Sequence, residues 1–182
     1  MSDVDIILPT YNCEKYIEET LDSIIVQSFQ NWKLIIVDDA SKDSTVKLIT
    51  EYLRDKRITL ISLKKNKGAG FCRNLGIRNS KSAYIAFIDS DDIWEKNKLS
   101  KQINFMKSNK YSFTYTNYFT FNQEKQKENY KEIITPKYLT FKRFIKNTSI
   151  STCTMMIKRS SVENTKFSNT KICEDYFFKC QI

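Results

Sequence analysis

The stretch Leu34-Ile35-Ile36-Val37-Asp38-Asp39 is an apolar run that ends abruptly in two carboxylates. A second run, Tyr84-Ile85-Ala86-Phe87-Ile88, ends in the same way in Asp89-Ser90-Asp91-Asp92. Continuous apolar runs of this kind are typical of strands that are buried in a parallel sheet, and such sheets bind ligands outside the carboxyl ends of their strands. Because a lone buried Asp is costly, the two clusters indicate a site for a divalent cation with a polyol or phosphate ligand.

Strand and helix patterns alternate on both sides of these runs. We expect strands at 4–8, 32–37, 58–63 and 83–88. Apolar residues at helical spacing predict a helix through Ile17–Ile25, capped by Asn12, and two further helices at about 46–53 and 71–79. The βαβαβαβ order predicts an α/β fold, with a mostly parallel central sheet flanked by helices.

The second half of the chain is less regular. Leu99, Ile103 and Met106 indicate a helix. Alternating aromatic residues over 113–121 are typical of a half-exposed strand, and 151–157 reads as a later strand. We expect a polar loop over 122–134 and a short helix that starts at Glu174.

Length and hydropathy favour one domain over residues 1–182, with a ligand-binding half (1–95) and a basic half (96–182). The chain stops soon after the suggestive pair Glu174-Asp175, so we expect a fragment that is truncated at the C-terminus. No apolar stretch is long enough to span a bilayer, and a strand-like run begins at Val4 in place of a signal segment. These features predict a protein of the cytoplasm, with peripheral association at the inner face of the cell membrane as part of that expectation.

Charge separates the two halves. Residues 1–95 carry 13 Lys and Arg against 15 Asp and Glu, whereas residues 96–182 carry 17 against 6. The basic half suits an anionic membrane surface, an anionic lipid-linked substrate or nucleic acid, and a merely solvated Lys-rich surface is an equal alternative. Without a recognised reading motif, nucleic acid is not expected. Residues 137–146 fit a basic amphipathic helix that lies against an anionic bilayer.

The chain has no histidine and five cysteines without paired spacing. We therefore expect reduced thiols, and acid–base chemistry must come from carboxylates, Lys, Tyr or Cys.

Asp89-x-Asp91 is the first group that could carry chemistry. Mg²⁺ and Mn²⁺ commonly bind one or two carboxylates together with substrate phosphates, so this pair suits a nucleotide diphosphate. An Asp-rich turn without a metal is the alternative reading.

Other segments add groups that could bind a nucleotide. Asp38-Asp39 can accept from a base or a ribose, and Tyr11 can stack on a base or simply pack on the surface. Lys67-Gly68-Ala69-Gly70 precedes a helix, and Arg73 follows. The glycines allow close backbone approach, and Arg73 can bind a diphosphate bidentately. A solvated basic turn is an equal alternative here.

The segments "DIILPTYNCEKYIEETLDSIIVQSFQNWKLIIVDDASKDST" (5–45), "NKGAGFCRNLGI", "AYIAFIDSDDIW" and "CEDYFF" together resemble the family 2 glycosyltransferases of the GT-A fold. The likeness is strong over 4–95 and looser over 150–182. It implies an inverting transfer from a nucleotide sugar, with UDP favoured, to a saccharide or lipid-linked acceptor in bacterial surface polysaccharide biosynthesis.

The resemblance also assigns roles to residues. It implies a nucleotide-sugar site made of Pro9, Tyr11, Asp38, Asp39, Arg73, Asp89 and Ser90. It implies Mn²⁺ or Mg²⁺ on Asp91. The catalytic base would be Asp175, with Glu174 as second choice.

Two alternatives remain. "FIDSDDI" is close to the Asp-x-Asp motif of haloacid dehalogenase-like phosphatases, with Asp89 as nucleophile, although position 93 is Ile and the motif lies far from the start. An inactive, nucleotide-binding transferase-like module is the non-enzymatic alternative.

Overall fold

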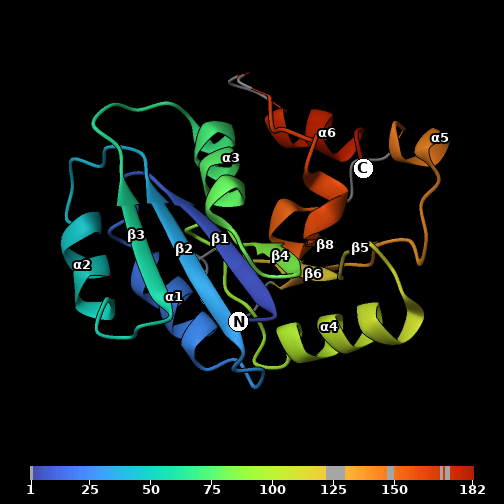
Figure 1. The fold of residues 1–182 in the computed structure, drawn as a ribbon, viewed down its shortest axis with the longest axis horizontal. Coiled ribbons are helices and arrows are strands. Elements are labelled where there is room, and N and C mark those ends of the chain that lie inside the picture. The colour runs from blue at the N-terminus through green and yellow to red at the C-terminus, as the bar shows by residue number, and fades with distance from the viewer. Residues whose placement is uncertain (1, 122–129, 147–149, 169, 171–172) are drawn as a thin grey trace.

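The structure is a computed structural model that describes residues 2–121, 130–146, 150–168, 170 and 173–182. A six-stranded sheet crosses the molecule, with helices on both of its faces (Figure 1). The strands are β1 Val4–Thr10, β2 Trp32–Asp38, β3 Ile58–Ser62, β4 Tyr84–Phe87, β5 Phe113–Thr114, β6 Tyr118–Thr120, β7 Lys131–Ile133 and β8 Met156–Lys158. The helices are α1 Ile17–Ile25, α2 Thr45–Tyr52, α3 Ala69–Asn79, α4 Lys98–Asn109, α5 Phe141–Phe144 and α6 Glu174–Lys179, with 3-10 turns at Thr152–Thr154 and Arg159–Val162.

The sheet has the order β3-β2-β1-β4-β8-β5. β3, β2, β1 and β4 are parallel, whereas β8 pairs antiparallel with both β4 and β5. β6 and β7 form a separate antiparallel pair. The predicted α/β fold with a mostly parallel central sheet is thus confirmed, and the carboxyl ends of β1, β2 and β4 meet at one edge.

Alternate residues of β1 serve the two faces of the sheet, as the two-residue period of a strand requires. Ile6 and Leu8 are in the core that also holds the apolar sides of α1, α2 and α4. Ile7 is in a second core, which contains Phe87 and reaches Phe178 of α6. The burial of both faces explains why these strands read as continuous apolar runs.

α3 lies directly on β1 at Gly76. A Cβ atom at this position would lie 2.5 Å from Cγ2 of Ile7. We expect Gly76→Ala to lower the free energy of unfolding by about 1–3 kcal/mol, because overpacking outweighs the better helix propensity of Ala. Urea denaturation checks this, with Asn79→Ala on the exposed end of α3 as the control. A gain in stability for Gly76→Ala would contradict the close packing.

Two strand predictions for the second half are wrong in detail. The run 113–121 is broken into β5 and β6, because Oδ1 of Asn117 accepts hydrogen bonds from the backbone N–H and the hydroxyl of Thr135. The run 151–157 begins as a 3-10 turn, where the Thr154 hydroxyl donates to the Ser151 carbonyl, and only then becomes β8. Part of the expected loop 122–134 is strand β7, and its residues 122–129 lie outside the described residues.

Two helix predictions are also wrong in detail. Residues 137–146 form only the four-residue helix α5. Asn12 does not cap α1, which begins at Ile17; its side chain accepts a hydrogen bond from the Lys42 backbone instead, at 2.8 Å. Within the described part of the chain, no helix is both long and apolar enough to cross a membrane.

Candidate functional site

A pocket of about 270 Å³ opens at the carboxyl edge of β1, β2 and β4. Its walls come from four segments that are far apart in sequence. Seven of the ten predicted site residues line this one pocket: Pro9, Tyr11, Asp39, Arg73, Asp89, Ser90 and Asp91. Thr10, Ala69 and Cys72 complete the lining. The topology therefore brings the two acidic clusters together, as the strand ends predicted.

Asp38 is the predicted nucleotide-site residue that does not line the pocket. It is buried, and its carboxylate accepts from the Thr10 hydroxyl at 3.3 Å. It also accepts from the backbone N–H and the hydroxyl of Ser41, at 3.1 and 2.5 Å. Asp38 thus fixes the loop after β2, and its contacts are structural.

Asp39 joins β2 to the glycine-containing loop. Its two carboxylate oxygens accept from the backbone N–H groups of Lys67 and Gly68, both at 2.7 Å. Gly68 has a φ of +89°, a conformation that residues with a side chain rarely adopt. Asp39 therefore holds this loop against the pocket, with its carboxylate in the wall.

Arg73 is buried on α3 between two carboxylates. One terminal nitrogen donates to Asp89 Oδ1 at 2.6 Å, and the other donates to Glu174 Oε1 at 2.9 Å. Burial alone would lower the pKa of Arg73, but the two carboxylates outweigh burial and raise it. Nε is buried, and no described residue hydrogen-bonds to it. An anionic ligand at Arg73 would therefore have to compete with Asp89 and Glu174 for the guanidinium, and the sequence did not predict these two ion pairs.

The carboxylates after β4 crowd the pocket mouth. Asp91 is exposed, and Asp92 behind it is half-buried. Burial, and then the negative charges of Asp89 and Asp91, raise the pKa of Asp92 to about 6, although Cys153 acts in the opposite direction. Among the described residues, no three His, Cys, Asp or Glu side chains form a ready metal cluster. This donor set fits a hard cation that takes its remaining oxygens from a ligand.

Asp175 lies on α6, and it is not among the lining residues of the pocket. Its Oδ2 atom accepts from the Thr152 hydroxyl at 3.0 Å and from Lys179 Nζ at 2.6 Å. Burial would raise the pKa of Asp175, but Lys179 and Thr152 lower it. Asp175 is thus an oriented carboxylate that is ionised at neutral pH.

Glu174, the residue before Asp175 on α6, pairs with Arg73 of the pocket wall, whereas Asp175 pairs with Lys179. Sequence reasoning missed Thr152 and Lys179, which orient Asp175. Lys179 follows Asp175 by four residues, and that helical spacing is a signal that could have found it. Thr152 carries no such signal, because its contact depends on the tertiary fold.

Lys98 is a buried cation beneath the acidic loop. Its Nζ atom lies 3.7 Å from the centre of the Trp94 ring, and no described group hydrogen-bonds to it. Burial lowers the pKa of Lys98 to about 7. The indole N–H of Trp94 donates to the Cys153 carbonyl at 3.0 Å, so this pair connects the acidic loop to the turn that carries Thr152.

This burial predicts a pH-dependent stability. The unfolded chain keeps the Lys98 proton up to about pH 10.4, whereas the folded protein releases it near pH 7. Between these values the unfolded state binds more protons, so rising pH stabilises the fold. Relative to Lys98→Met, the wild-type free energy of unfolding should rise by roughly 2–4 kcal/mol from pH 7 to 10. Denaturant titrations across this pH range check the prediction, and Lys101→Met, at an exposed position of the same helix, is the control. A difference in unfolding free energy between wild type and Lys98→Met that does not change with pH would contradict it.

A second, larger pocket of about 570 Å³ lies on the other side of α3. Its described lining is Phe71, Asn74, Arg78, Asn164, Lys166, Phe167, Ser168 and Gln181. None of these side chains is a carboxylate, so the described lining of this pocket offers no anionic ligand for a hard cation. The smaller pocket remains the candidate functional site.

Comparisons with known proteins agree with this choice. The model of the family "Glycosyl transferase family 2" matches residues 5–165. The chain is 38% identical to the putative teichuronic acid biosynthesis glycosyltransferase TuaG of Bacillus subtilis, over 94% of this chain and 68% of the relative. It is 35% identical to the UDP-Glc:alpha-D-GlcNAc-diphosphoundecaprenol beta-1,3-glucosyltransferase WfgD of Escherichia coli, over 96% of this chain and 67% of the relative.

Among solved structures, S. aureus TarS residues 1–349 in complex with UDP matches with a TM-score of 0.78 and 27% identity. The match covers 98% of this chain and 54% of the TarS chain, so the chain spans about half of that structure. The likeness confirms the GT-A-type fold that the sequence predicted.

Proposed function

Because the chain belongs to glycosyl transferase family 2, we propose that it transfers a sugar from a UDP-sugar to a saccharide or lipid-linked acceptor, with inversion at the anomeric carbon. The observation that carries the proposal is the single pocket that gathers Tyr11, Asp39, Arg73 and Asp91 from four segments of the chain. Family membership also favours a transferase over the phosphatase and inactive-module alternatives.

The donor half of the proposal uses the pocket walls. Tyr11 is half-exposed at the carboxyl end of β1, where its ring can stack on the uracil. The Asp39 carboxylate can accept from the uracil N–H or from the ribose while it holds the loop at Gly68. Pro9 and Ser90 complete the walls on the ribose side. The TarS relative binds UDP, which supports uridine as the base.

The diphosphate half of the proposal uses the crowded carboxylates. Asp91, with Asp89 beside it, would hold Mn²⁺ or Mg²⁺, and such a cation would neutralise the diphosphate as it leaves. Asp89 would then be shared with Arg73, which lies 2.6 Å away. Arg73 would place a positive charge at the pocket floor, where the diphosphate charge develops.

Asp175 is the proposed base, with Glu174 as second choice. In the reaction, the acceptor oxygen forms a bond to the anomeric carbon, the bond from that carbon to the diphosphate oxygen breaks, and the hydroxyl proton passes to the Asp175 carboxylate. Lys179 and Thr152 fix the orientation of this carboxylate. Glu174 suits a base less well, because Arg73 already holds it.

The acceptor is proposed from the relatives. WfgD is named for a diphosphoundecaprenol-linked acceptor, and TuaG for teichuronic acid biosynthesis. We extend this to bacterial surface polysaccharide, with the reaction in the cytoplasm at the inner face of the membrane. Within one domain, residues 1–95 would form the donor-binding half, and residues 96–182 would contain the acceptor side, at Asp175 of α6.

A thermal-shift screen of nucleotide sugars tests the donor. With Mn²⁺ present, UDP-sugars should raise the melting temperature more than GDP-, CDP- or dTDP-sugars, and chelation should reverse the shift. Release of UDP in the presence of a diphospholipid-linked sugar then tests transfer. Stabilisation by none of the nucleotides, or by a GDP-sugar alone, would overturn the proposed donor, and release of phosphate from a simple monoester would revive the phosphatase reading.

A further inference from the structure

Exposed aromatic and aliphatic side chains gather in the segment from β7 to α5. In the described part of this segment, five large apolar side chains have exposed fractions of 45–73%: Tyr130, Ile134, Tyr138, Phe141 and Ile145. Phe119 of β6 and Phe121, which follows that strand, contact Tyr130 with ring centres 6.5 and 5.9 Å away. We call residues 130–146 with these two rings the aromatic–basic face. Single exposed apolar residues are ordinary, but such a group marks an interaction surface.

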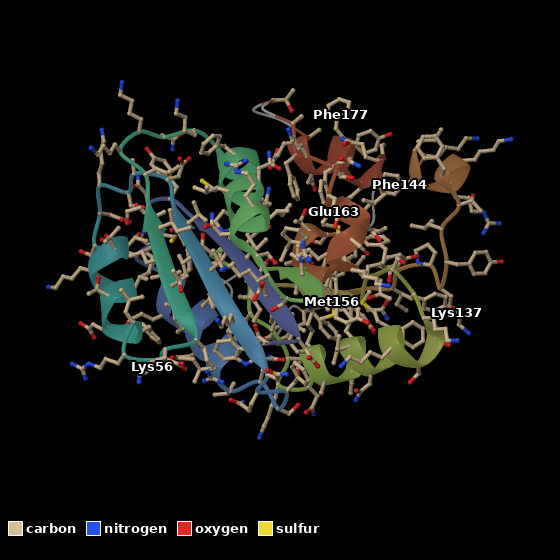
Figure 2. The ribbon with its side chains drawn as sticks, viewed as in Figure 1. Lys56, Lys137, Phe144, Met156, Glu163 and Phe177 are labelled. Atoms are coloured by element: carbon tan, nitrogen blue, oxygen red, sulfur yellow. The ribbon has the colours of Figure 1, made fainter. Side chains whose placement is uncertain are left out.

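The charge of this face is strongly positive. Residues 130–146 contain the basic side chains Lys131, Lys137, Lys142, Arg143 and Lys146, and Glu132 is their one acidic residue. Among the described residues, none of these five cations forms a salt bridge. Figure 2 labels Lys137 at one margin of the molecule and Lys56 at the opposite margin, near α2. The aromatic–basic face thus lies on the opposite side of the molecule from β3, which is an edge strand of the sheet.

The face is attached to the helix that carries Asp175. Phe144 of α5 is buried in the core with Phe178. Its ring stacks on Tyr176, the residue after Asp175, with centres 5.5 Å apart and planes 20° apart. The Thr140 side chain caps α5 by accepting from the Arg143 backbone N–H. Phe144 therefore anchors α5 inward and leaves Phe141 exposed to solvent.

We infer that the aromatic–basic face binds the surface of an anionic lipid bilayer and so brings α6 to a lipid-linked acceptor. The inference rests on the proposed function for its acceptor. Aromatic rings settle at the boundary between headgroups and acyl chains, and Lys and Arg side chains bury their stems while their charges reach the anionic headgroups. A protein partner would need an apolar patch and an acidic surface that match the face together, whereas an anionic bilayer presents both features over its whole surface. Single-stranded nucleic acid is bound along a positively charged groove, whereas the described residues of the face line neither of the two pockets above.

Co-sedimentation with vesicles tests the inference. Wild type should bind phosphatidylcholine vesicles that contain 30% phosphatidylglycerol at least tenfold more tightly than pure phosphatidylcholine. Two variants should each lose at least tenfold of that affinity: Lys142→Glu with Arg143→Glu, and Ile134→Ser with Phe141→Ser. All four side chains are exposed, so the fold should remain, as circular dichroism and melting temperature can verify.

Matched controls change the same chemistry elsewhere. Arg54→Glu with Lys56→Glu reverses two exposed charges after α2, and Phe105→Ser with Tyr111→Ser removes two exposed aromatic rings at α4. Both controls should bind vesicles like wild type. Equal losses in the controls, or no preference of wild type for the anionic vesicles, would overturn the inference. Binding of a single-stranded DNA 30-mer that the face variants abolish, without vesicle binding, would replace the membrane by nucleic acid.

Activity separates this inference from the proposed function. With a short-chain, water-soluble acceptor, the face variants should release UDP as fast as wild type. With the long-chain acceptor in anionic vesicles, they should be at least tenfold slower. If wild type binds vesicles but turns over neither acceptor, the proposed function is wrong and the inference about the bilayer surface is retained. If the variants match wild type on the vesicle acceptor, the inference about the surface is wrong and the proposed function is retained.

Discussion

Asp175→Asn should bind UDP with wild-type affinity and transfer sugar about 10²–10⁴-fold more slowly. Asn keeps the shape of the side chain and its hydrogen bond with Thr152, but it cannot take a proton from the acceptor. Calorimetry with UDP and Mn²⁺ measures binding, and UDP release with acceptor measures transfer. Because the pKa of Asp175 lies below its usual value, wild-type activity should not depend on this group above about pH 5.

Asp55→Asn is the control for this variant, because it alters a half-buried carboxylate that pairs with Arg57 beside β3, away from the pocket. It should transfer sugar at the wild-type rate. Full activity of Asp175→Asn would contradict the assignment. If Glu174→Gln then lost transfer while UDP binding stayed intact, the base would be Glu174.

Asp91→Ala should lose metal-dependent UDP binding. Asp91 is the exposed carboxylate at the pocket mouth, and its neighbour Asp89 is already engaged by Arg73. We expect UDP affinity in Mn²⁺ to fall at least tenfold, to the level that wild type shows with EDTA. Titration calorimetry with and without the chelator measures both.

Glu95→Ala is the matched control, because Glu95 is an exposed carboxylate four residues further along the same loop. It should retain wild-type affinity and the wild-type response to EDTA. UDP binding by Asp91→Ala that is as tight as wild type, and equally sensitive to EDTA, would place the metal elsewhere.

The donor pocket could be predicted because its walls follow from local rules. Leu34–Val37 is buried on both faces of the sheet, so the run is continuously apolar, and the carboxylates that follow must lie at the edge. The same reasoning located Asp89 and Asp91. The ion pairs of Arg73 could not be predicted in this way, because Glu174 is 101 residues away along the chain.

The second half was less predictable for the same physical reason. Its strands are short, and they are broken by non-local hydrogen bonds. Asn117 bonds to Thr135, and the Trp94 indole bonds to the Cys153 carbonyl in the turn before β8. Periodicity reports which side chains are buried, but it carries no information about such partners. The position of Asp175 was inferred from a motif alone, and its orientation by Thr152 and Lys179 required the tertiary structure.

The central claim is that the sheet edge binds a UDP-sugar with a cation at Asp91. The most direct measurement is a crystal structure with UDP and Mn²⁺, in which anomalous scattering locates the metal. The account predicts an anomalous peak within bonding distance of an Asp91 carboxylate oxygen, with the uracil against Tyr11 and within hydrogen-bonding reach of Asp39. UDP in the larger pocket beside Arg78 and Lys166, or a peak away from the loop after β4, would contradict it.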